Sequence, residues 1–558
     1  MDHRSNTLAG RARRAGILLG GAVALAIVMT WPLAAGMSTL GRSTGGGDGL
    51  FSIWNVAWVA RTVVVDPVHL FDANIFYPHR GTLAYSEANI GAGLVAVVPW
   101  WLTRNPYAAH NAAVLAAFAS AFLGMWFLAR YLTNDARVAT IAGLLFGFCP
   151  YLFAHSAHIQ LLMCGGLPLS MLMVHRVADA PRAASGIALG TVLAAQALAC
   201  GYYGIFAGLM VGYAVLFFAV SRNLWRDRSY WLAVGIGAIV SIACVFPFFL
   251  PYLSLQRDEG PLRALADSIR YSANAQSYVA SATHAHYWMI GATAGWRRWT
   301  DVLFPGFLTL GFGTAGLVLG LCTRKNAAHP KDRETALLYG TLAALAFWAS
   351  FGPSAGLYAL LFRLPAFSLL HAPARFGLVV IMTLVALASL ALRRLLARLR
   401  GTRQIVVTVA LAGVAIAELN VLPFPWERAE PIPEVYAVLA KMPRRPLAEF
   451  PFYGERPVFH LHTQYMLFST THWMPLVNGY SDFFPADFRS TAPALAAFPT
   501  VDSFRLLARY RVRYLGIHWD MYVSRADEIR AKLEPFQKYL RPIASDSTMT
   551  LYEIVGFP

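Results

Sequence analysis

A single carboxylate, Asp48, is the residue best placed to take part in a reaction. It is the only acidic residue between His3 and Val65, and it lies in a glycine-rich run (45–49) just after a first hydrophobic stretch. Glycine lets the backbone approach a bound group closely, and a lone carboxylate beside a bilayer is costly without a partner or a role. Asp48 could accept a proton from an attacking hydroxyl or hold a divalent cation. The alternative is a loop aspartate that caps a helix beginning near Leu50.

A second polar group lies in the segment that follows. His79, Arg80 and Glu87 place cationic and anionic side chains in one loop. The planar guanidinium of Arg80 matches the oxygens of a phosphate group, and we predict that His79 and Glu87 line a substrate pocket. The alternative is a turn held by an ion pair between Arg80 and Glu87.

Two histidines and a glutamine, His155, His158 and Gln160, lie at a short junction between apolar stretches. The histidines share a face if the turn is helical, and the three side chains could bind a sugar hydroxyl, a phosphate or a metal. Two histidines without a carboxylate do not complete a typical zinc site, so the cofactor is not determined and a divalent metal such as Mg or Mn stays open. The alternative is a set of ordinary polar residues at helix ends.

The segment from His371 to Arg375 opens another apolar stretch. Pro373 predicts the start of a helix, where backbone N–H groups point outward without partners. Arg375 in the first turn would add its charge to the helix dipole and attract an anion. We therefore predict that Arg375, with Arg80 and His371, binds the phosphate of a donor. The alternative is an arginine that extends toward water from the membrane, although a positive charge at a helix N-terminus is unfavourable.

Aromatic residues cluster in the same predicted loops, as in Tyr202-Tyr203 and Tyr287-Trp288. Such side chains could stack against sugar rings. They are equally typical of the belt that anchors a protein at the membrane interface, and the sequence leaves both interpretations open.

The elements that must position these residues are predicted from composition. The chain has 558 residues, of which 57% are hydrophobic and only 13% are charged, whereas soluble proteins carry roughly 25% charged residues. Eleven apolar stretches approach the ~20 residues that span a bilayer. They cover residues 15–37, 108–129, 138–154, 159–176, 184–200, 204–220, 231–251, 306–322, 335–351, 374–392 and 404–422. We predict an all-α polytopic membrane bundle of about 11 transmembrane helices.

The basic residues predict the orientation of this bundle. They gather in alternate short loops: Arg130 and Arg137; Arg176 and Arg182; Arg222, Arg226 and Arg228; Arg324, Lys325, Lys331 and Arg333; and Arg393, Arg394, Arg398, Arg400 and Arg403. By the positive-inside rule the N-terminus is cytoplasmic and the C-terminal region is extracytoplasmic. The net charge of +17 thus reflects membrane orientation, and no nucleic-acid partner is expected. The candidate residues above all fall on or near the outer face.

A change of composition near residue 423 predicts a domain boundary. Four prolines follow within eleven residues, and beyond them 447–452, 514–519 and 548–555 read as strands. We predict a transmembrane domain over 1–422, with long outer loops at 38–107 and 252–305, and a small extracytoplasmic α/β domain over 423–558. Within the first loop, 50–65 suits a helix that lies in the membrane interface, with Trp54 and Trp58 as interface residues. Residues 87–101 suit a second such helix or a short twelfth span, and the charge pattern opposes the span.

The chain resembles the GT-C superfamily of glycosyltransferases, in its bacterial multi-pass form. The resemblance lies in the order of elements and in four phrases, at 71–78 (FDANIFYP), 303–306 (LFPG), 373–376 (PARF) and 477–481 (VNGYS). This superfamily uses polyprenyl-phosphate-linked sugars and includes oligosaccharyltransferases, protein mannosyltransferases and aminoarabinose transferases. The resemblance implies that Asp48 takes the place of the first-loop catalytic aspartate. Many members have an acidic pair there, whereas Asp48 is followed by glycine, and the WWD-type acceptor motif of oligosaccharyltransferases is absent from the sequence.

Together these patterns predict a glycosyltransferase of the bacterial inner membrane. It would move a sugar from a polyprenyl-phosphate-linked donor to a glycan, lipid or protein acceptor on the extracytoplasmic face, with Asp48 as base or metal ligand. Two alternatives are a cell-envelope polysaccharide polymerase or ligase and, from a different class, a lipid or solute transporter. A transporter would be expected to carry polar groups at the bilayer midplane and broken helices in repeated halves, and the sequence shows neither.

Overall fold

The computed structural model describes residues 8–42, 47–259, 264–323, 329–364, 367 and 370–558. Arg324 and Lys325 of the predicted inner loops, and residues 45–46 of the glycine run, lie outside these ranges. The chain forms two compact units. We call Met1–Ala35, Val114–Leu250 and Gln256–Pro425 the helical unit, and Gly36–Ala113, Pro251–Leu255 and Trp426–Pro558 the mixed unit. The first outer loop thus belongs to the same unit as the C-terminal region, and whether 423–558 folds by itself stays a prediction.

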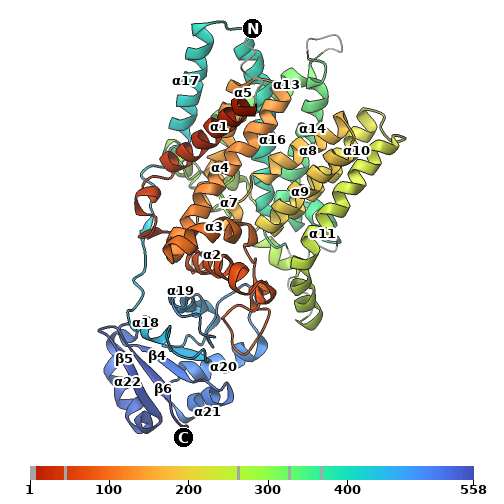
Figure 1. Ribbon diagram of the computed structural model, residues 1–558. Coiled ribbons are helices and arrows are strands. Elements are labelled where there is room, and N and C mark those ends of the chain that lie inside the picture. The colour runs from red at the N-terminus through yellow and green to blue at the C-terminus, as the bar shows by residue number, and fades with distance from the viewer. Residues whose placement is uncertain (1–7, 43–46, 260–263, 324–328, 365–366, 368–369) are drawn as a thin grey trace. The chain divides into compact units, whose positions relative to one another are not determined.

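The helical unit is built from apolar helices connected by short loops (Figure 1). They are α1 (Leu8–Met29), α5 (Ala136–Gly147), α6 (Pro150–Ala154), α7 (Ile159–Leu162), α8 (Gly166–Asp179), α9 (Ala183–Ala199), α10 (Gly201–Ser221), α12 (Tyr287–Ala292), α13 (Phe307–Leu321), α14 (Asp332–Ser350), α15 (Leu357–Leu361), α16 (Gly377–Ala397) and α17 (Thr402–Glu418), with most of α4 (Pro106–Thr133) and α11 (Arg228–Glu259). The buried α16 packs against α13 and α14. A Cβ atom on Gly316 would lie 1.9 Å from the carbonyl oxygen of Leu387, so glycine allows α13 and α16 to approach closely, as in other membrane helix pairs.

Helices occupy all of the ranges predicted to span the membrane. Among the described residues, seven candidate spans are long and apolar enough to cross: Ala12–Met29, Pro106–Thr133, Ala136–Ala154, Ile159–Asp179, Gly201–Ser221, Arg228–Glu259 and Pro373–Ala397. The helices of Ala183–Ala199 and Phe307–Leu321 are apolar but shorter. A multi-helix membrane architecture is therefore confirmed, while the count of eleven crossings stays a prediction.

Contacts at the two ends of α10 involve different loops. Arg222, after α10, forms ion pairs with Asp179 and Glu334 at 2.5 and 2.8 Å, which joins the ends of α8, α10 and α14. Tyr202, at the start of α10, accepts a hydrogen bond from the backbone N–H of His371 at 2.9 Å. The loop after Arg222 and the segment at His371 are therefore separated along α10, while their sides of the membrane stay a prediction.

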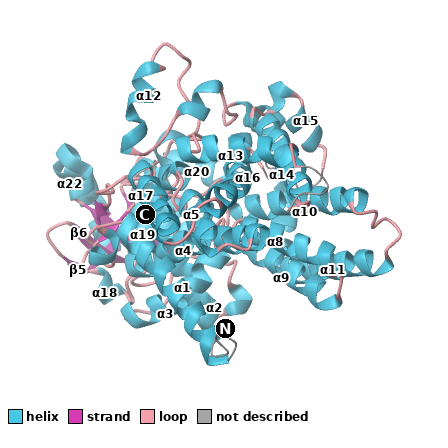
Figure 2. Cartoon of the chain, turned by 90° about the horizontal axis from the view of Figure 1, so that it is seen from above, coloured by secondary structure: helices cyan, strands magenta, loops and turns pink. Residues whose placement is uncertain are grey.

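The mixed unit contains the strands, which lie side by side (magenta in Figure 2). Its elements are β1 (Leu40–Gly41), α2 (Asp48–Val65), α3 (Ile90–Thr103), β2 (Glu427–Arg428), α18 (Tyr436–Leu439), β3 (Leu447–Phe450), α19 (His462–Phe468), α20 (Ala486–Ala496), α21 (Val501–Arg509), β4 (Tyr514–His518), α22 (Ala526–Leu533), β5 (Leu540–Ser545) and β6 (Met549–Ile554). The three predicted strands are confirmed as β3, β4 and β6.

The main sheet has the order β3-β4-β6-β5, with β3 parallel to β4 and the other pairs antiparallel. The sequence analysis missed β5, which contains Pro542. Proline cannot donate to a strand ladder and is therefore confined to edges and bulges. Here β5 is an edge strand whose register shifts between Pro542 and Ala544.

The two helices of the first loop, α2 and α3, differ in how far their apolar side chains are buried. In α2 the side chains of Trp54 and Trp58 are buried, and their indole N–H groups donate to Asn74 and to the carbonyl of Leu70. These tryptophans are core residues of the mixed unit, so their assignment to the interface was wrong. In α3, by contrast, apolar side chains such as Leu102 (80% exposed) remain uncovered within the unit.

Candidate functional site

A group of side chains that we call the cation cluster lies at one end of the helical unit. It consists of Arg375, His371, Tyr202 and Tyr271. The guanidinium carbon of Arg375 lies 4.2 Å from the ring centre of Tyr202, a distance at which the ring face attracts a cation. The ring of His371 lies 5.8 Å from that of Tyr202 and 4.9 Å from that of Tyr271. The hydroxyl of Tyr202 also contacts both the backbone N–H and Nδ1 of His371. Two predicted phosphate-binding residues are thus held together by one tyrosine.

The backbone before α16 holds this cluster in place. A short 3₁₀ helix (Pro373–Phe376) precedes α16, and the ring of Phe376 stacks on that of Phe206 of α10 at 4.0 Å. The N–H of Ala374 donates to the carbonyl of Tyr271 at 3.1 Å, and the N–H of Arg375 donates within its own turn. The prediction of unpartnered backbone N–H groups at this helix start was therefore wrong for these two residues, and any anion must be bound by side chains.

Arg375 is half-buried, and among the described residues no carboxylate lies within ion-pair distance of it. Its guanidinium N–H groups also form no hydrogen bond with the described residues, although the face of the Tyr202 ring stabilises the charge. A charge removed from water needs a counter-ion or a full set of hydrogen bonds. The guanidinium is thus prepared to receive an anion, and its planar fork matches phosphate.

A carboxylate that the sequence analysis did not select, Asp301, lies near this cluster. Its Oδ1 is 3.3 Å from Nε2 of His155, and Nδ1 of His155 lies 2.9 Å from the carbonyl oxygen of Tyr151. Burial lowers the pKa of His155, whereas Asp301 opposes that shift. Because Asp301 lies in a loop dominated by aromatic residues, 146 positions from His155, only the folded chain reveals the pair.

The His155–Asp301 pair lies in the electrostatic surroundings of Arg375. Arg375 and Asp301 both act on His155, where Arg375 lowers and Asp301 raises the pKa of the ring. The pair therefore belongs to the environment in which Arg375 would bind an anion.

The other residues predicted at this junction lie beside His155. The rings of His155 and His158 are 6.5 Å apart, but the turn between them is not helical, so the condition for the predicted shared helix face is not met. His158 precedes α7, and Gln160 lies in its first turn, half-buried and without a side-chain hydrogen bond among the described residues. His155 is therefore close enough to Arg375 and to His158 to feel the charge of both. Among the described residues, no contact joins Gln160 to this group.

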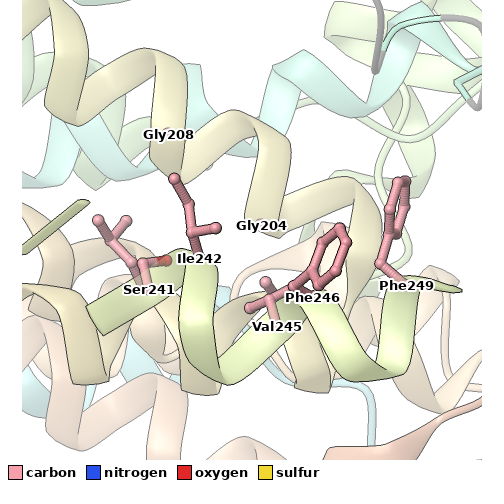
Figure 3. A pocket seen from close by; sticks show the side chains of 9 residues that line it. Gly204, Gly208, Ser241, Ile242, Val245, Phe246 and Phe249 are labelled. Atoms are coloured by element: carbon pink, nitrogen blue, oxygen red, sulfur yellow. The ribbon is translucent and has the colours of Figure 1, made fainter. Parts of the chain in front are cut away.

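An apolar groove begins two residues after Tyr202 along α10. It is lined by Gly204, Gly208, Leu193 and Ala197, together with α11 residues Ser241, Ile242, Val245, Phe246 and Phe249, and has a volume of about 280 Å³. Figure 3 shows the α11 side chains projecting beside the α10 turns that carry the two glycines. Because Gly208 has no side chain and no neighbour within 4 Å of a Cβ position, the groove stays open. Its surface suits a hydrocarbon chain.

In the mixed unit, Asp48 is the first residue of α2. The preceding Gly47 has a φ of +99° and lies so close to the 3₁₀ helix before α19 (Arg456–Leu461) that a Cβ would be 2.8 Å from the carbonyl oxygen of His460. The hydroxyl of Tyr480 donates to Oδ1 of Asp48 at 3.0 Å. The carboxylate is not the N-cap, since α2 begins at Asp48 and no side chain caps it. The capping alternative is therefore wrong, and Tyr480 is the partner that the sequence did not reveal.

The other first-loop candidates have separate surroundings. Nε2 of His79 lies 2.8 Å from Oδ1 of Asp487, beside a cavity of about 10 Å³, which holds one water at most. Arg80 is exposed and forms no ion pair with any described residue, so the proposed Arg80–Glu87 pair is absent. The carbonyl of Glu87 accepts a hydrogen bond from Asn55 at 3.1 Å.

Metal binding finds no support in the donor sets. Among the described residues, no group of three or more His, Cys, Asp or Glu side chains is arranged to hold a metal ion. His155 and Asp301 form a pair, and Asp48 is bonded to a tyrosine. No step of the chemistry below is therefore assigned to a metal.

Comparison with known proteins returned matches only at the level of structure. No protein-family model and no curated protein matches the sequence. The apo oligosaccharyltransferase of Archaeoglobus fulgidus matches over 96% of this chain and 74% of its own, with 14% identity and a TM-score of 0.46. ArnT from Cupriavidus metallidurans bound to undecaprenyl phosphate matches over 97% of both chains, with 15% identity and a TM-score of 0.43. Its apo form has a TM-score of 0.39 and 16% identity, over 97% of this chain and 98% of its own.

Because these matches have TM-scores below 0.5, they carry no argument about the family or the reaction of this chain.

Proposed function

We propose that this chain is a membrane glycosyltransferase that takes its sugar from a polyprenyl-phosphate-linked donor. The observation that carries the proposal is the half-buried Arg375, which lies on Tyr202 without a carboxylate partner among the described residues. An uncompensated cation in an apolar setting favours binding of an anion. The apolar groove between α10 and α11, which begins two residues after Tyr202 along the chain, supports a lipid as the molecule that bears this anion.

The cation cluster would bind the phosphate of the donor and stabilise the departing group. When the bond between the anomeric carbon and the phosphate oxygen breaks, both electrons leave with the oxygen, and negative charge grows on the phosphate. A guanidinium placed there stabilises that charge more in the transition state than in the ground state. His371, fixed by Tyr202, would add a second donor.

Asp48 would act on the acceptor. In this proposal its carboxylate accepts the proton of the acceptor hydroxyl as the oxygen forms a bond to the anomeric carbon. The products are the glycosylated acceptor, the polyprenyl phosphate and a protonated Asp48, which then returns the proton to water. His79, Arg80, Glu87, His158 and Gln160 remain candidates for contact with the sugar or the acceptor.

We infer that the reaction faces the extracytoplasmic side of the membrane. Support comes from the basic residues of the inner loops and from the ion pairs of Arg222, which gather those loops at the end of α10 opposite Tyr202. A lipid-linked donor suits that side, because it enters from the bilayer itself. The acceptor would be a glycan, a lipid or a protein of the cell envelope.

Binding of the spent carrier tests the proposal without knowledge of the sugar. The purified chain in lipid nanodiscs is titrated with undecaprenyl phosphate, and binding is measured by native mass spectrometry. Arg375→Gln removes charge-assisted hydrogen bonds of about 1.5–3 kcal/mol, so it should weaken binding roughly 10- to 100-fold. The affinity of Arg375→Lys should lie between those of the wild type and Arg375→Gln.

Arg298→Gln is the matched control. Arg298 also lies against an aromatic ring, that of Trp299 at 5.6 Å, but it is exposed. Its loss should leave binding unchanged. Equal binding by the wild type and Arg375→Gln would refute a donor-phosphate site at Arg375.

A further inference from the structure

We infer that Tyr480 is a positioning residue for Asp48, placed by a paired backbone segment that joins the first loop to the C-terminal region. The inference rests on the proposed transferase function and assigns part of the reaction centre to residues beyond 470. Tyr480 would act through Asp48 and would not itself touch the reacting atoms.

The segment that carries Tyr480 pairs with the first loop through backbone hydrogen bonds. The N–H of Tyr77 donates to the carbonyl of Leu476 at 2.7 Å, and the N–H of Leu476 donates to the carbonyl of Asn74 at 2.9 Å. The N–H of Phe76 donates to the carbonyl of Asn478 at 3.1 Å. Two phrases that stand 400 residues apart in the sequence therefore form one local structure.

Asn478 connects this segment to the sheet through hydrogen bonds. Its side-chain amide donates to the carbonyl of Glu449 in β3 at 3.0 Å, while its Oδ1 accepts the N–H of Glu449 at 2.8 Å. A further contact of 3.2 Å joins the amide to Nδ1 of His462. Paired in this way, the buried amide has a single orientation, which fixes the chain two residues before Tyr480.

Gly479 explains how the two segments come so close. A Cβ atom at this position would lie 2.7 Å from the ring of Phe76, which is closer than van der Waals contact. The absence of a side chain lets the Phe76 ring pack directly on the backbone. Glycine here therefore allows the segment that carries Tyr480 to lie directly against the first loop.

Tyr480 then meets Asp48 in a defined geometry. Its hydroxyl donates to Oδ1 of Asp48 at 3.0 Å. Its ring packs edge-on against Phe51 at 6.1 Å and lies 5.9 Å from the ring of Phe484. Phe51 follows Asp48 by three residues in α2, so ring and carboxylate share one helix face. The tyrosine thus bonds the carboxylate with its hydroxyl and packs on the same face with its ring.

A fixed carboxylate has a direct consequence for proton transfer. A general base must lie within hydrogen-bond reach of the proton that it accepts, and an error of about 1 Å in placement can cost ~100-fold in rate. By bonding Oδ1, Tyr480 restricts rotation of the carboxylate. Removal of the hydroxyl should therefore slow turnover and leave donor binding intact.

The experiment uses membranes from cells that lack this chain, which contain both the unused donor and the unmodified acceptor. Purified wild type, Tyr480→Phe, Asp48→Asn and the double variant are added, and loss of the accumulated polyprenyl-linked lipid is followed by mass spectrometry. Tyr480→Phe should lower the maximal rate about tenfold with an unchanged half-saturating lipid concentration and melting temperature.

The double variant separates positioning from packing. If Tyr480 acts through Asp48, Asp48→Asn with Tyr480→Phe is no slower than Asp48→Asn alone. Should that residual rate be too small to measure, Asp48→Glu serves as the background, because it retains a carboxylate that Tyr480 no longer aligns. Tyr510→Phe is the control: it removes a hydroxyl that contacts Thr491 at 3.1 Å and should keep the wild-type rate.

The outcomes distinguish this inference from the proposed function. Wild-type turnover by Tyr480→Phe, or a further loss in the double variant, overturns the positioning role while the transferase proposal stands. No loss of lipid with the wild-type chain overturns the proposed function itself. Wild-type turnover by Asp48→Asn overturns the role of Asp48 and, with it, the inference.

Discussion

The two candidate regions of this protein differ in whether their polar groups have hydrogen-bond partners. Around Arg375, in the helical unit, a guanidinium lies on a tyrosine ring with N–H groups that no described residue accepts. Around Asp48, in the mixed unit, Tyr480, Asn478 and Glu449 form hydrogen bonds that link the carboxylate's partner to the sheet. The first region keeps hydrogen-bond donors that can bind a ligand. In the second region the hydrogen-bonding groups are used to hold residues in place.

This difference indicates a division of labour between binding and reaction. A site that must take up an anion benefits from an uncompensated cation, although that cation destabilises the unliganded protein. A base that must meet a hydroxyl benefits instead from a rigid surrounding shell. Substitutions in the two regions should therefore change different measurements, and the predictions below test that separation.

The largest effect is expected for Asp48→Asn. The amide has nearly the same shape and can still accept the hydrogen bond from Tyr480, but it cannot accept a proton. General base catalysis contributes about 10²- to 10⁴-fold, so turnover of the lipid donor in deletion membranes should fall by that factor. Binding of undecaprenyl phosphate should stay at the wild-type level. Loss of binding together with turnover would break the proposed separation.

Acid should destabilise the mixed unit through two buried histidines. Burial lowers the pKa of His462 and of His472 to about 3, whereas an unfolded histidine titrates near ~6.5. Because the folded state resists protonation, stability is complete above pH ~6.5 and is lost as the pH falls toward 3, by about 1.4 kcal/mol per pH unit and histidine. Hydrogen exchange of β3 between pH 7 and 4 measures the loss.

His462→Gln should flatten this pH dependence, because glutamine does not titrate. His69→Gln is the matched control, since the His69 side chain is 59% exposed and pairs with Asp66 on the surface, and it should leave the profile unchanged. If acid loosens β3 equally in all three proteins, the buried histidines are not the cause.

A smaller effect is expected for Asp301→Asn in the helical unit. Asp301 and Arg375 both act electrostatically on His155, so a carboxylate at position 301 opposes the binding of an anion at Arg375. Its removal should strengthen binding of undecaprenyl phosphate severalfold, on the order of one screened charge interaction of about 1 kcal/mol. Asp66→Asn, at an exposed carboxylate of the mixed unit, is the control and should leave binding unchanged. Unchanged binding by Asp301→Asn would exclude the charge argument.

The smallest effect is expected for Gly208→Leu. The position is open to the groove, so the added side chain should fold without strain and displace part of a bound hydrocarbon chain. Loss of one methylene contact, about 0.8 kcal/mol, corresponds to a roughly fourfold weaker binding of undecaprenyl phosphate. Farnesyl phosphate, whose chain is much shorter, serves as the comparison ligand. A similar loss for both lipids would exclude the groove as the tail site.

Much of the secondary structure could be predicted because it depends on local pattern. Apolar length predicted the helices, and alternation predicted β3, β4 and β6, whereas Pro542 concealed β5. The interpretation of Trp54 and Trp58 as interface residues was wrong because aromatic residues at helical spacing suit either a membrane surface or a core. Only the contacts with Asn74 and Leu70 distinguish these cases.

The candidate site could be predicted only in part. Arg375 and His371 were selected together because they are neighbours in sequence, and the structure keeps them together. Asp301 was missed because its partner, His155, lies far away in the chain. The tie between Tyr480 and Asp48 spans 432 residues, and no spacing rule reaches so far.

By itself the sequence determined which residues could carry charge into an apolar chain and where its helices run. These properties follow from hydropathy and charge over neighbouring residues. Only the tertiary structure decided which candidates acquire partners: Asp48 a tyrosine, His155 a carboxylate, and Arg375 an aromatic ring without a counter-ion among the described residues. Partner choice depends on packing between distant segments, where a hydrogen bond or ion pair forms only if the backbone brings both groups within about 3 Å.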